Sequence, residues 1–353
     1  MKKPGRLLGS VSAAAFAILA SSPALASGTL AGSTITNTVT VNYQVGSVAQ
    51  TATSASNSFK VDRKVNVTVA ETGSATTQVS PGQTAAVTTF TVTNLSNAAL
   101  DFALVAAQQS GGTAAHSGTD NFDVTNVKIY VDTNNNGSYD PGTDLEVSYL
   151  DEVAADASKT VFVVADIPLS LSTGSVAGVT LTATGREGGT AGSQGAALVE
   201  TTGADSANTV DTVFADGAGS SDSARDAAYS AKDDYTVLAA ALTIVKSSKV
   251  ISDPLNGTTN PKAIPGATIE YCISVANAAG GAGASNVAIS DPLPVTVTYD
   301  SGYGIFLNGT VTSGVCNADG AAGGSYSSGT VSGTLSSVAA GATKTMRFRA
   351  VIN

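Results

Sequence analysis

Residues 128–150 contain the spacing of acidic and amide side chains that best suits metal binding. The segment Asp132–Asp144 lies between the runs 128–131 and 145–150, where apolar and polar residues alternate as in half-buried strands. Counted from Asp132, oxygen donors occupy positions 1, 3, 5, 7 and 9 of an EF-hand loop, with glycine at position 6. We therefore predict a calcium-binding hairpin loop. Its predicted ligands are Asp132, Asn134, Asn136, Ser138, Asp140 and Asp144.

The closing position of this loop departs from the EF-hand pattern. Position 12 is Thr143 instead of a bidentate glutamate, and Asp144 closes the site only if Pro141–Gly142 shifts the register. The flanks are predicted strands and not helices, so a calcium-loop hairpin is expected. The alternative is a long turn without an ion, in which Asn136 and Gly137 supply the positive-φ positions.

The sequence offers little that could carry catalysis. His116 is the only histidine, and its loop-like surroundings indicate a solvated side chain. We find no nucleophile elbow for a serine hydrolase and no glycine-rich phosphate loop. The carboxylate pairs Asp151–Glu152 and Asp233–Asp234 are interpreted as surface charges because no cleft is recognisable. We therefore predict a protein that is not an enzyme.

The first 26 residues have the pattern of a secretory signal peptide. Lys2, Lys3 and Arg6 precede a short apolar run, and Ala24–Ala26 is a small-x-small cleavage site. The apolar run is shorter than the roughly 20 residues that span a bilayer, so no integral membrane segment is predicted. We expect a secreted protein that is extracellular or cell-surface associated, with the periplasm as the alternative.

The charge of the chain excludes one class of partner. Removal of the three basic residues of the signal peptide lowers the formal net charge from −10 to −13. Such a chain is repelled by nucleic acid and by anionic membranes. Cys272 and Cys316 are the only two cysteines, and in an oxidising compartment a disulfide is favoured over a zinc site, which needs more ligands.

Composition and turn spacing predict an all-β protein with tandem Ig-like or Greek-key β-sandwich domains. After the signal peptide we expect a short β-module over residues 27–62. A larger sandwich then covers residues 63–236 and contains the calcium-type loop. Its segment 185–234 is rich in Gly, Ala, Ser and Asp and is interpreted as a solvated acidic excursion. A third domain follows over residues 237–353, led by an apolar strand from Tyr235 to Lys246.

The last domain carries a series of motifs with a family resemblance. They are L-T-I-V-K-S-S from Leu242, the segments Pro265–Tyr271 and Asp291–Pro294, and a late strand ending at Phe348. Residues 242–353 resemble the bacterial and archaeal surface repeat called "domain of unknown function eleven". The resemblance implies an Ig-like β-sandwich of a secreted or cell-envelope protein, without catalysis.

The N-terminal module resembles one half of such a repeat. Repeats of this family often continue into a segment of the type G-T-x-I-x-N-T-A-T-V. The sequence reaches Asn353 without such a segment, but a similar one occurs at Ala31–Val41. One hypothesis is that the module completes the C-terminal domain of a neighbouring chain by strand addition and so builds a filament. The alternative is that the module packs on the second domain of its own chain.

These observations favour a non-enzymatic structural or interaction protein of the bacterial cell surface or extracellular matrix. Its work would be spacing, adhesion or self-association, and its partners would be other surface proteins or copies of itself. The competing hypothesis is a periplasmic or surface binding module for a glycan or small ligand. The absence of Trp and the scarcity of aromatic residues weaken the glycan version, because sugar sites rely on aromatic faces.

Overall fold

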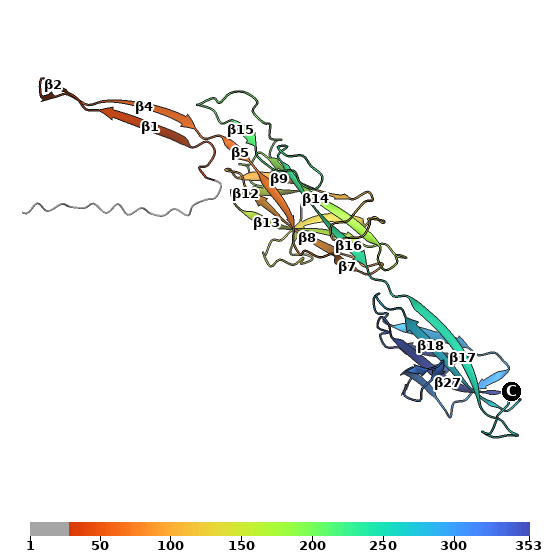
Figure 1. Cartoon of the computed structure of the whole chain (residues 1–353). Helices are drawn as coiled ribbons and strands as arrows, with labels where there is room; N and C mark the ends of the chain where they lie inside the picture. Colours follow the sequence, from red (N-terminus) through yellow and green to blue (C-terminus); the bar gives the residue numbers. More distant parts are fainter. Residues whose placement is uncertain (1–27) are drawn as a thin grey trace, which may run out of the picture.

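A computed structural model describes residues 28–353, and the predicted signal peptide over residues 1–26 lies outside this range. The described chain contains 27 strands and no helix. It accordingly has no helix with the length and hydrophobicity that a membrane crossing requires. Three β-rich bodies follow one another along the chain in an extended row (Figure 1). The prediction of an all-β protein with tandem β-sandwich domains is confirmed.

The N-terminal body is a long β-hairpin that projects from the central sandwich (Figure 1). β1 (Thr34–Val41) pairs antiparallel with β4 (Thr53–Lys60), and the tip carries the short strands β2 (Gln44–Val45) and β3 (Val48–Ala49). Every residue of β1 and β4 is exposed. The hairpin is therefore attached at its base and has no core of its own.

The central body is a sandwich of two five-stranded sheets. In the first sheet the order is β11-β10-β13-β8-β6. Its strands are β6 (Val67–Glu71), β8 (Ala86–Asn94), β10 (Thr125–Val131), β11 (Leu145–Glu146) and β13 (Ser158–Asp166). In the second sheet the order is β12-β9-β14-β16-β7. Its strands are β7 (Thr77–Val79), β9 (Leu100–Gln108), β12 (Tyr149–Val153), β14 (Val176–Arg186) and β16 (Ala228–Val237). A parallel pair joins β5 (Arg63–Val65) to β15 (Thr212–Phe214).

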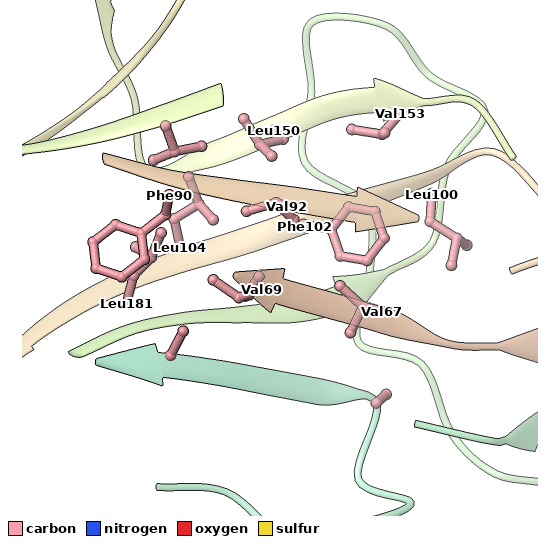
Figure 2. Packing of buried hydrophobic residues seen from close by; sticks show 14 of the residues in the cluster. Val67, Val69, Phe90, Val92, Leu100, Phe102, Leu104, Leu150, Val153 and Leu181 are labelled. Carbon is pink, nitrogen blue, oxygen red and sulfur yellow. The ribbon is translucent and has the colours of Figure 1, made fainter. Parts of the chain in front are cut away.

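Alternation of buried and partly exposed residues is clearest in β8, whereas β13 and β14 contain continuous buried runs. In β8 every second residue is buried, as expected of a strand that faces a core on one side only. Phe90 and Val92 from β8 meet Phe102 and Leu104 from β9 between the two sheets (Figure 2). A second cluster around Tyr235 extends the core towards β7. The central body is thus stabilised by hydrophobic burial.

The interpretation of residues 185–234 as a solvated excursion is wrong at its C-terminal end. Ala228–Val237 forms β16, which pairs with β14 along its length, and Asp233 and Asp234 are buried. The predicted strand from Tyr235 to Lys246 is likewise two elements, because β16 ends at Val237 and the next strand begins at Leu242. Acidic residues concealed the strand, since buried carboxylates are rare and break the apolar pattern.

The C-terminal body is a smaller sandwich. Its larger sheet has the order β17-β18-β27-β21-β24, with β20 on β27, and its smaller sheet has the order β19-β26-β25. The larger sheet contains β17 (Leu242–Ser252), β18 (Thr268–Asn277), β20 (Val297–Tyr299), β21 (Ile305–Gly309), β24 (Ala321–Ala322) and β27 (Thr343–Ile352). The smaller contains β19 (Val287–Pro292), β25 (Ser325–Ser327) and β26 (Thr330–Leu335). β22 (Val311–Thr312) and β23 (Val315–Cys316) form a separate two-stranded ribbon.

Candidate functional site

The predicted hairpin loop is present in the first sheet of the central sandwich. Val131 of β10 pairs with Leu145 of β11, so residues 132–144 connect two antiparallel neighbours. Gly137 has a φ of 76°. Both the calcium loop and the turn without an ion require this left-handed conformation, which favours glycine. The second left-handed residue is Asn135 and not Asn136.

Two buried carboxylates hold the ends of the loop. Asp132 accepts hydrogen bonds from the backbone amides of Asn136 at 3.3 Å and Gly137 at 2.8 Å. Asp144 accepts from the backbone amides of Thr133 at 3.1 Å and Asp140 at 2.7 Å. The two aspartates thereby fold the loop back on itself and bring its central side chains together.

The side chains of Asn134 and Asn136 converge on Asp140. Their carboxamide NH2 groups donate to the same oxygen, Oδ2 of Asp140, at 2.9 Å and 2.6 Å. These two hydrogen bonds lower the pKa of the Asp140 carboxyl below its usual value. Ser138 joins the network through its backbone amide, which donates to Asn136 at 2.8 Å. The loop therefore gathers the predicted residues around Asp140, with amide donors facing the carboxylate.

Three other groups of acidic side chains have ligand atoms within 4.8 Å of one another in the part of the chain that the structure describes. They are Glu71–His116–Asp233, Asp62–Asp205–Asp211 and Asp101–Asp151–Glu152, and the 132–144 loop is not among them. Asp151 and Glu152 are adjacent and Asp205 is close to Asp211, but each group also has a member from a distant part of the sequence. Residue spacing alone could not reveal the complete groups, because the fold brings these segments together.

The interpretation of His116 as a solvated side chain is wrong. Only 17% of the side chain is exposed, and carboxylates of Glu71, Asp233 and Asp234 surround the imidazole. Burial raises the pKa of the Asp233 carboxyl to about 7. The Asp233–Asp234 pair is therefore part of a buried cluster and not a surface charge.

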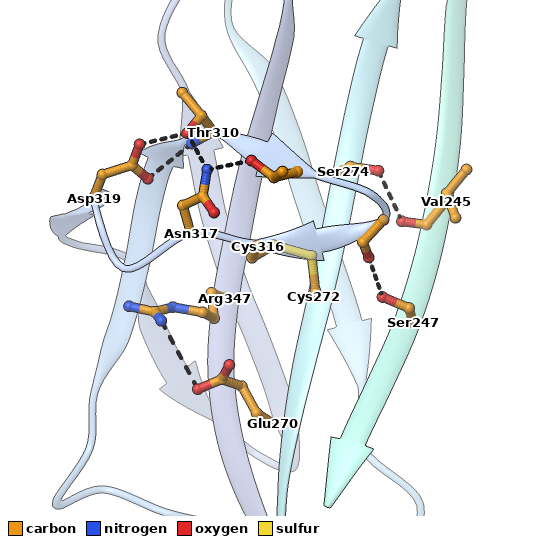
Figure 3. Close-up of a disulfide and its surroundings, with 12 residues drawn as sticks. Val245, Ser247, Glu270, Cys272, Ser274, Thr310, Cys316, Asn317, Asp319 and Arg347 are labelled. Carbon is orange, nitrogen blue, oxygen red and sulfur yellow. Dashed lines mark hydrogen bonds and ion pairs between the residues drawn. A yellow bond between two sulfur atoms is a disulfide. The ribbon is translucent and has the colours of Figure 1, made fainter. Parts of the chain in front are cut away.

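Cys272 and Cys316 form the predicted disulfide, which is confirmed. It joins β18 to the short ribbon strand β23 across 44 residues of sequence (Figure 3). The ribbon is further tied to β17, since the hydroxyl of Ser247 donates to the carbonyl of Gly314 at 3.2 Å. On the same sheet Glu270 forms an ion pair with Arg349 at 3.0 Å. The larger sheet is thus fastened by covalent and ionic contacts.

The N-terminal hairpin has one polar and one apolar face. On the polar face, hydroxyl pairs bridge the two strands at 2.8 Å: Thr36–Ser58, Thr38–Ser56 and Thr40–Ser54. The opposite, mainly apolar face carries Ile35, Val39 and Val41 from β1 with Phe59 from β4, interrupted by the pair Asn37–Asn57, and the four apolar side chains are exposed, Val39 by 59%. A two-stranded ribbon of this kind leaves its apolar surface in water and is only marginally stable alone.

The C-terminal sandwich has an open edge with an apolar groove. β17 and β19 are the outermost strands of its two sheets. A groove of about 310 Å³ lies between them, with Ile244 and Ile273 on one side and Val287 and Ile289 on the other. Ile244 is 67% exposed. One ion pair, from Lys246 to Asp291 at 2.7 Å, bridges the two strands beside the groove. Unpaired edges of this type can accept an additional strand.

No family model matches the chain, and no curated protein sequence matches it. Among solved structures, the chain is similar to the C-terminal domain of the AgI/II polypeptide BspA from Streptococcus agalactiae. The identity is 8% and the TM-score 0.34, covering 81% of this chain and 91% of that chain. For the class 5 fimbriae chaperone CfaA the values are 7% and 0.23, covering 78% and 83%. For a putative membrane anchored protein from Corynebacterium diphtheriae they are 11% and 0.19, covering 91% and 89%. None of the three is named as an enzyme, and the likeness concerns the β-rich fold alone.

Proposed function

We propose that the chain is a secreted structural protein of the bacterial cell surface or extracellular matrix that joins copies of itself end to end. The apolar face of hairpin β1–β4 in one copy packs into the groove between β17 and β19 in the next. One observation carries this proposal: the N-terminal hairpin exposes apolar side chains and the C-terminal sandwich leaves an apolar groove uncovered. These two bodies lie at opposite ends of the row (Figure 1).

Strand addition explains why both surfaces are built from β-edges. An added strand gains backbone hydrogen bonds from the edge and places alternate side chains in pockets. Val39 and Ile35 alternate along β1 in this way, and Ile244 and Val287 line the receiving groove. Donor and acceptor occupy different surfaces, so the contact is head to tail and repeats into an open filament unless it closes into a ring.

The decisive experiment compares neighbouring residues on opposite faces of each strand. Val39→Lys charges the apolar face of the hairpin, and its control Thr38→Lys charges the polar face. Ile244→Lys charges the groove, and its control Val245→Lys changes a residue that does not line it. We expect Val39→Lys and Ile244→Lys to abolish filaments in electron micrographs and to give monomers in light scattering, while both controls still assemble.

Three results would contradict the assembly. They are monomers throughout for the intact mature chain, equal effects of both lysines in each pair, and unchanged assembly after deletion of residues 27–61. A monomeric chain that takes up one saturable soluble ligand would instead favour the binding module.

We further infer that calcium stiffens the 132–144 loop. The loop supplies hard oxygen donors of the type that calcium prefers, and hydrogen bonds from loop N–H groups hold Asp132, Asp140 and Asp144 within one short loop. The NH2 groups of Asn134 and Asn136 now donate to Asp140. If both carboxamides rotated, their oxygens would face Asp140 instead, and a cation would bind between them. Such a site would bind weakly, resist proteolysis and perform no catalysis.

Calcium removal tests the loop. Chelation is expected to lower the melting temperature of the intact chain. Asp132→Ala with Asp140→Ala also removes backbone hydrogen bonds of the loop, so it should lower the melting temperature under both conditions and abolish the difference that calcium makes. Asp166→Ala is a control for the Asp140 change and should keep that difference, because Asp166 is also a partly exposed carboxylate held by an asparagine side chain. If neither calcium nor chelator changed the melting temperature, the calcium proposal would be wrong and the assembly proposal would be unaffected.

We infer a non-enzymatic role, and we propose that residues 242–353 are a copy of the surface repeat that they resemble. His116 contacts carboxylates and not the serine or cysteine nucleophile that acyl transfer requires. The disulfide agrees with a location outside the cytoplasm. Cell fractionation would separate the surface from the periplasm, and any hydrolytic activity of the purified chain that is lost in His116→Ala would contradict this role.

A further inference from the structure

The His116 cluster lies in the central sandwich and shares no residue with the 132–144 loop. His116 belongs to the connection between β9 and β10, and its backbone amide donates to Asp234 of β16 at 2.7 Å. The imidazole Nε2 lies 3.5 Å from Oε2 of Glu71, the last residue of β6. Its Nδ1 lies 3.6 Å from Oδ1 of Asp233 and 3.7 Å from Oδ2 of Asp234. Three carboxylates therefore face both nitrogens of one ring.

Two buried polar atoms of this cluster have no hydrogen-bond partner, although backbone amides donate to Glu71, to Oδ1 of Asp233 and to Oδ2 of Asp234. Separations of 3.5–3.7 Å are longer than normal hydrogen bonds. Nδ1 of His116 and Oδ1 of Asp234 are buried without a hydrogen-bond partner, and the Asp234 side chain is fully buried with its carboxylate facing the ring. Buried polar atoms in native proteins normally have a partner, so these two point to a missing one.

The other two acidic clusters differ in this respect. In one, Asp62 accepts from the backbone amide of Asp211 at 2.9 Å, and Asp211 accepts from Ser206 at 3.2 Å. In the other, Asp101 accepts from the backbone amides of Glu152 and Gly195, both at 2.8 Å. Backbone amides bind those carboxylates, as they also bind Glu71, Asp233 and Oδ2 of Asp234, so the difference lies only in the buried atoms that are left without a partner. The His116 cluster alone among the three leaves a buried nitrogen and a buried carboxylate oxygen free for a ligand.

We propose that His116, Glu71 and Asp233 bind a divalent first-row transition metal ion of the zinc class, with Asp234 beside them. Their ligand atoms lie within 4.8 Å of one another. Zinc bonds to nitrogen and oxygen are about 2.0–2.2 Å long, which places neighbouring ligands of a tetrahedron about 3.4 Å apart. For an ion on Nε2, the distance of 3.5 Å from this nitrogen to Oε2 of Glu71 is close to that edge.

The donor chemistry selects this class of metal over calcium or magnesium. Calcium and magnesium prefer oxygen ligands alone, whereas imidazole with carboxylates suits zinc and its neighbours. One ion takes one ring nitrogen: with the ion on Nε2 beside Glu71, the carboxylate of Asp234 faces Nδ1 and can accept its N–H. A carboxylate that accepts the second N–H is the usual way to orient a metal-bound histidine.

The metal would add a further link between three segments of the central sandwich. The ligands come from β6, from the β9–β10 connection and from β16. An open depression of about 410 Å³, lined by Glu71, Ala115 and Lys232 among others, adjoins the cluster and gives an ion a route from solvent. The expected role is a structural fastening of the loop around His116.

Zinc titration of the tag-free mature chain tests the site. After dialysis against a chelator, isothermal titration at pH 7.5 is expected to show one zinc ion bound, and cobalt is expected to give visible absorption bands of a low-coordinate site. His116→Gln should weaken zinc binding by at least about 100-fold, and Asp234→Asn, beside the metal, by about 10-fold to 100-fold. Hydrogen exchange should slow on zinc binding in residues 112–118 and 228–234 only.

Two controls keep the result interpretable. Asp211→Asn removes a carboxylate from another acidic cluster and should leave zinc affinity unchanged. Asp132→Ala with Asp140→Ala should also leave it unchanged, which separates this site from the calcium loop. Zinc binding that is absent, that survives His116→Gln in a variant with a native circular dichroism spectrum, or that Asp211→Asn weakens equally, would overturn the proposal.

Discussion

Both sandwiches use a buried asparagine to hold loops at one end, but they differ in their sheet edges. β8 and β18 each end in a buried asparagine, Asn94 and Asn277. The amide of Asn94 donates to the carbonyls of Ala98 and Val153 at 2.9 and 2.8 Å. The amide of Asn277 donates to two loop carbonyls at 2.9 and 3.0 Å in the same manner. In both domains one side chain therefore holds the loops at a sandwich end.

The difference lies in what covers the edges. The central sandwich has two clusters of buried hydrophobic residues and five strands in each sheet. The C-terminal sandwich has one cluster, a three-stranded second sheet and an uncovered groove, and it carries the disulfide. The central domain is complete by itself, whereas the C-terminal domain is fastened covalently and left open where a further strand could pack.

The largest expected effect comes from removing a large side chain from the hydrophobic core of the central sandwich. Phe102→Ala removes a fully buried ring and should lower the free energy of unfolding by about 3–5 kcal/mol. Phe306→Ala in the C-terminal domain is the matched control, since Phe306 is only partly buried. Hydrogen exchange resolved by segment would measure each domain separately, and equal losses in the two variants would contradict the assignment of the core.

Removal of the disulfide should affect the C-terminal sandwich alone. Cys272→Ser with Cys316→Ser opens a loop of 44 residues in the unfolded chain and should cost about 2–4 kcal/mol. Denaturant unfolding followed by segment-resolved exchange, with and without a reductant, gives the measurement. If protection of β8 and β14 fell as much as that of β18, the two domains would not be independently stabilised.

The paired asparagines should respond alike, with a smaller effect. Asn94→Ala and Asn277→Ala each leave buried loop carbonyls without a donor, and each should cost about 1–3 kcal/mol in its own domain. Thermal unfolding of the two variants, compared with exposed Asn57→Ala in the hairpin, gives the ranking. If only one of the two substitutions lowered the free energy of unfolding, the two asparagines would not have the same role in the two sandwiches.

The sequence predicted the fold class, the 132–144 hairpin and the disulfide because each depends on local spacing or on a choice between two cysteines. Strand alternation is visible wherever one face is apolar, as in β8. It failed for β16, where buried Asp233 and Asp234 interrupt the apolar pattern. The His116 cluster could not be predicted at all, because its four members span residues 71–234 and meet only through strand pairing.

The smallest expected effect on stability concerns the open groove. Ile244→Ala removes a side chain that is 67% exposed, so the isolated chain should lose less than about 0.5 kcal/mol. Ile273→Ala removes a buried neighbour of the same groove and should cost about 2–5 kcal/mol. Measured at a concentration where the chain is monomeric, this contrast shows that Ile244 serves no internal packing. If Ile244→Ala were as destabilising as Ile273→Ala, the groove would already be filled within the chain, and the C-terminal sandwich would be as complete as the central one.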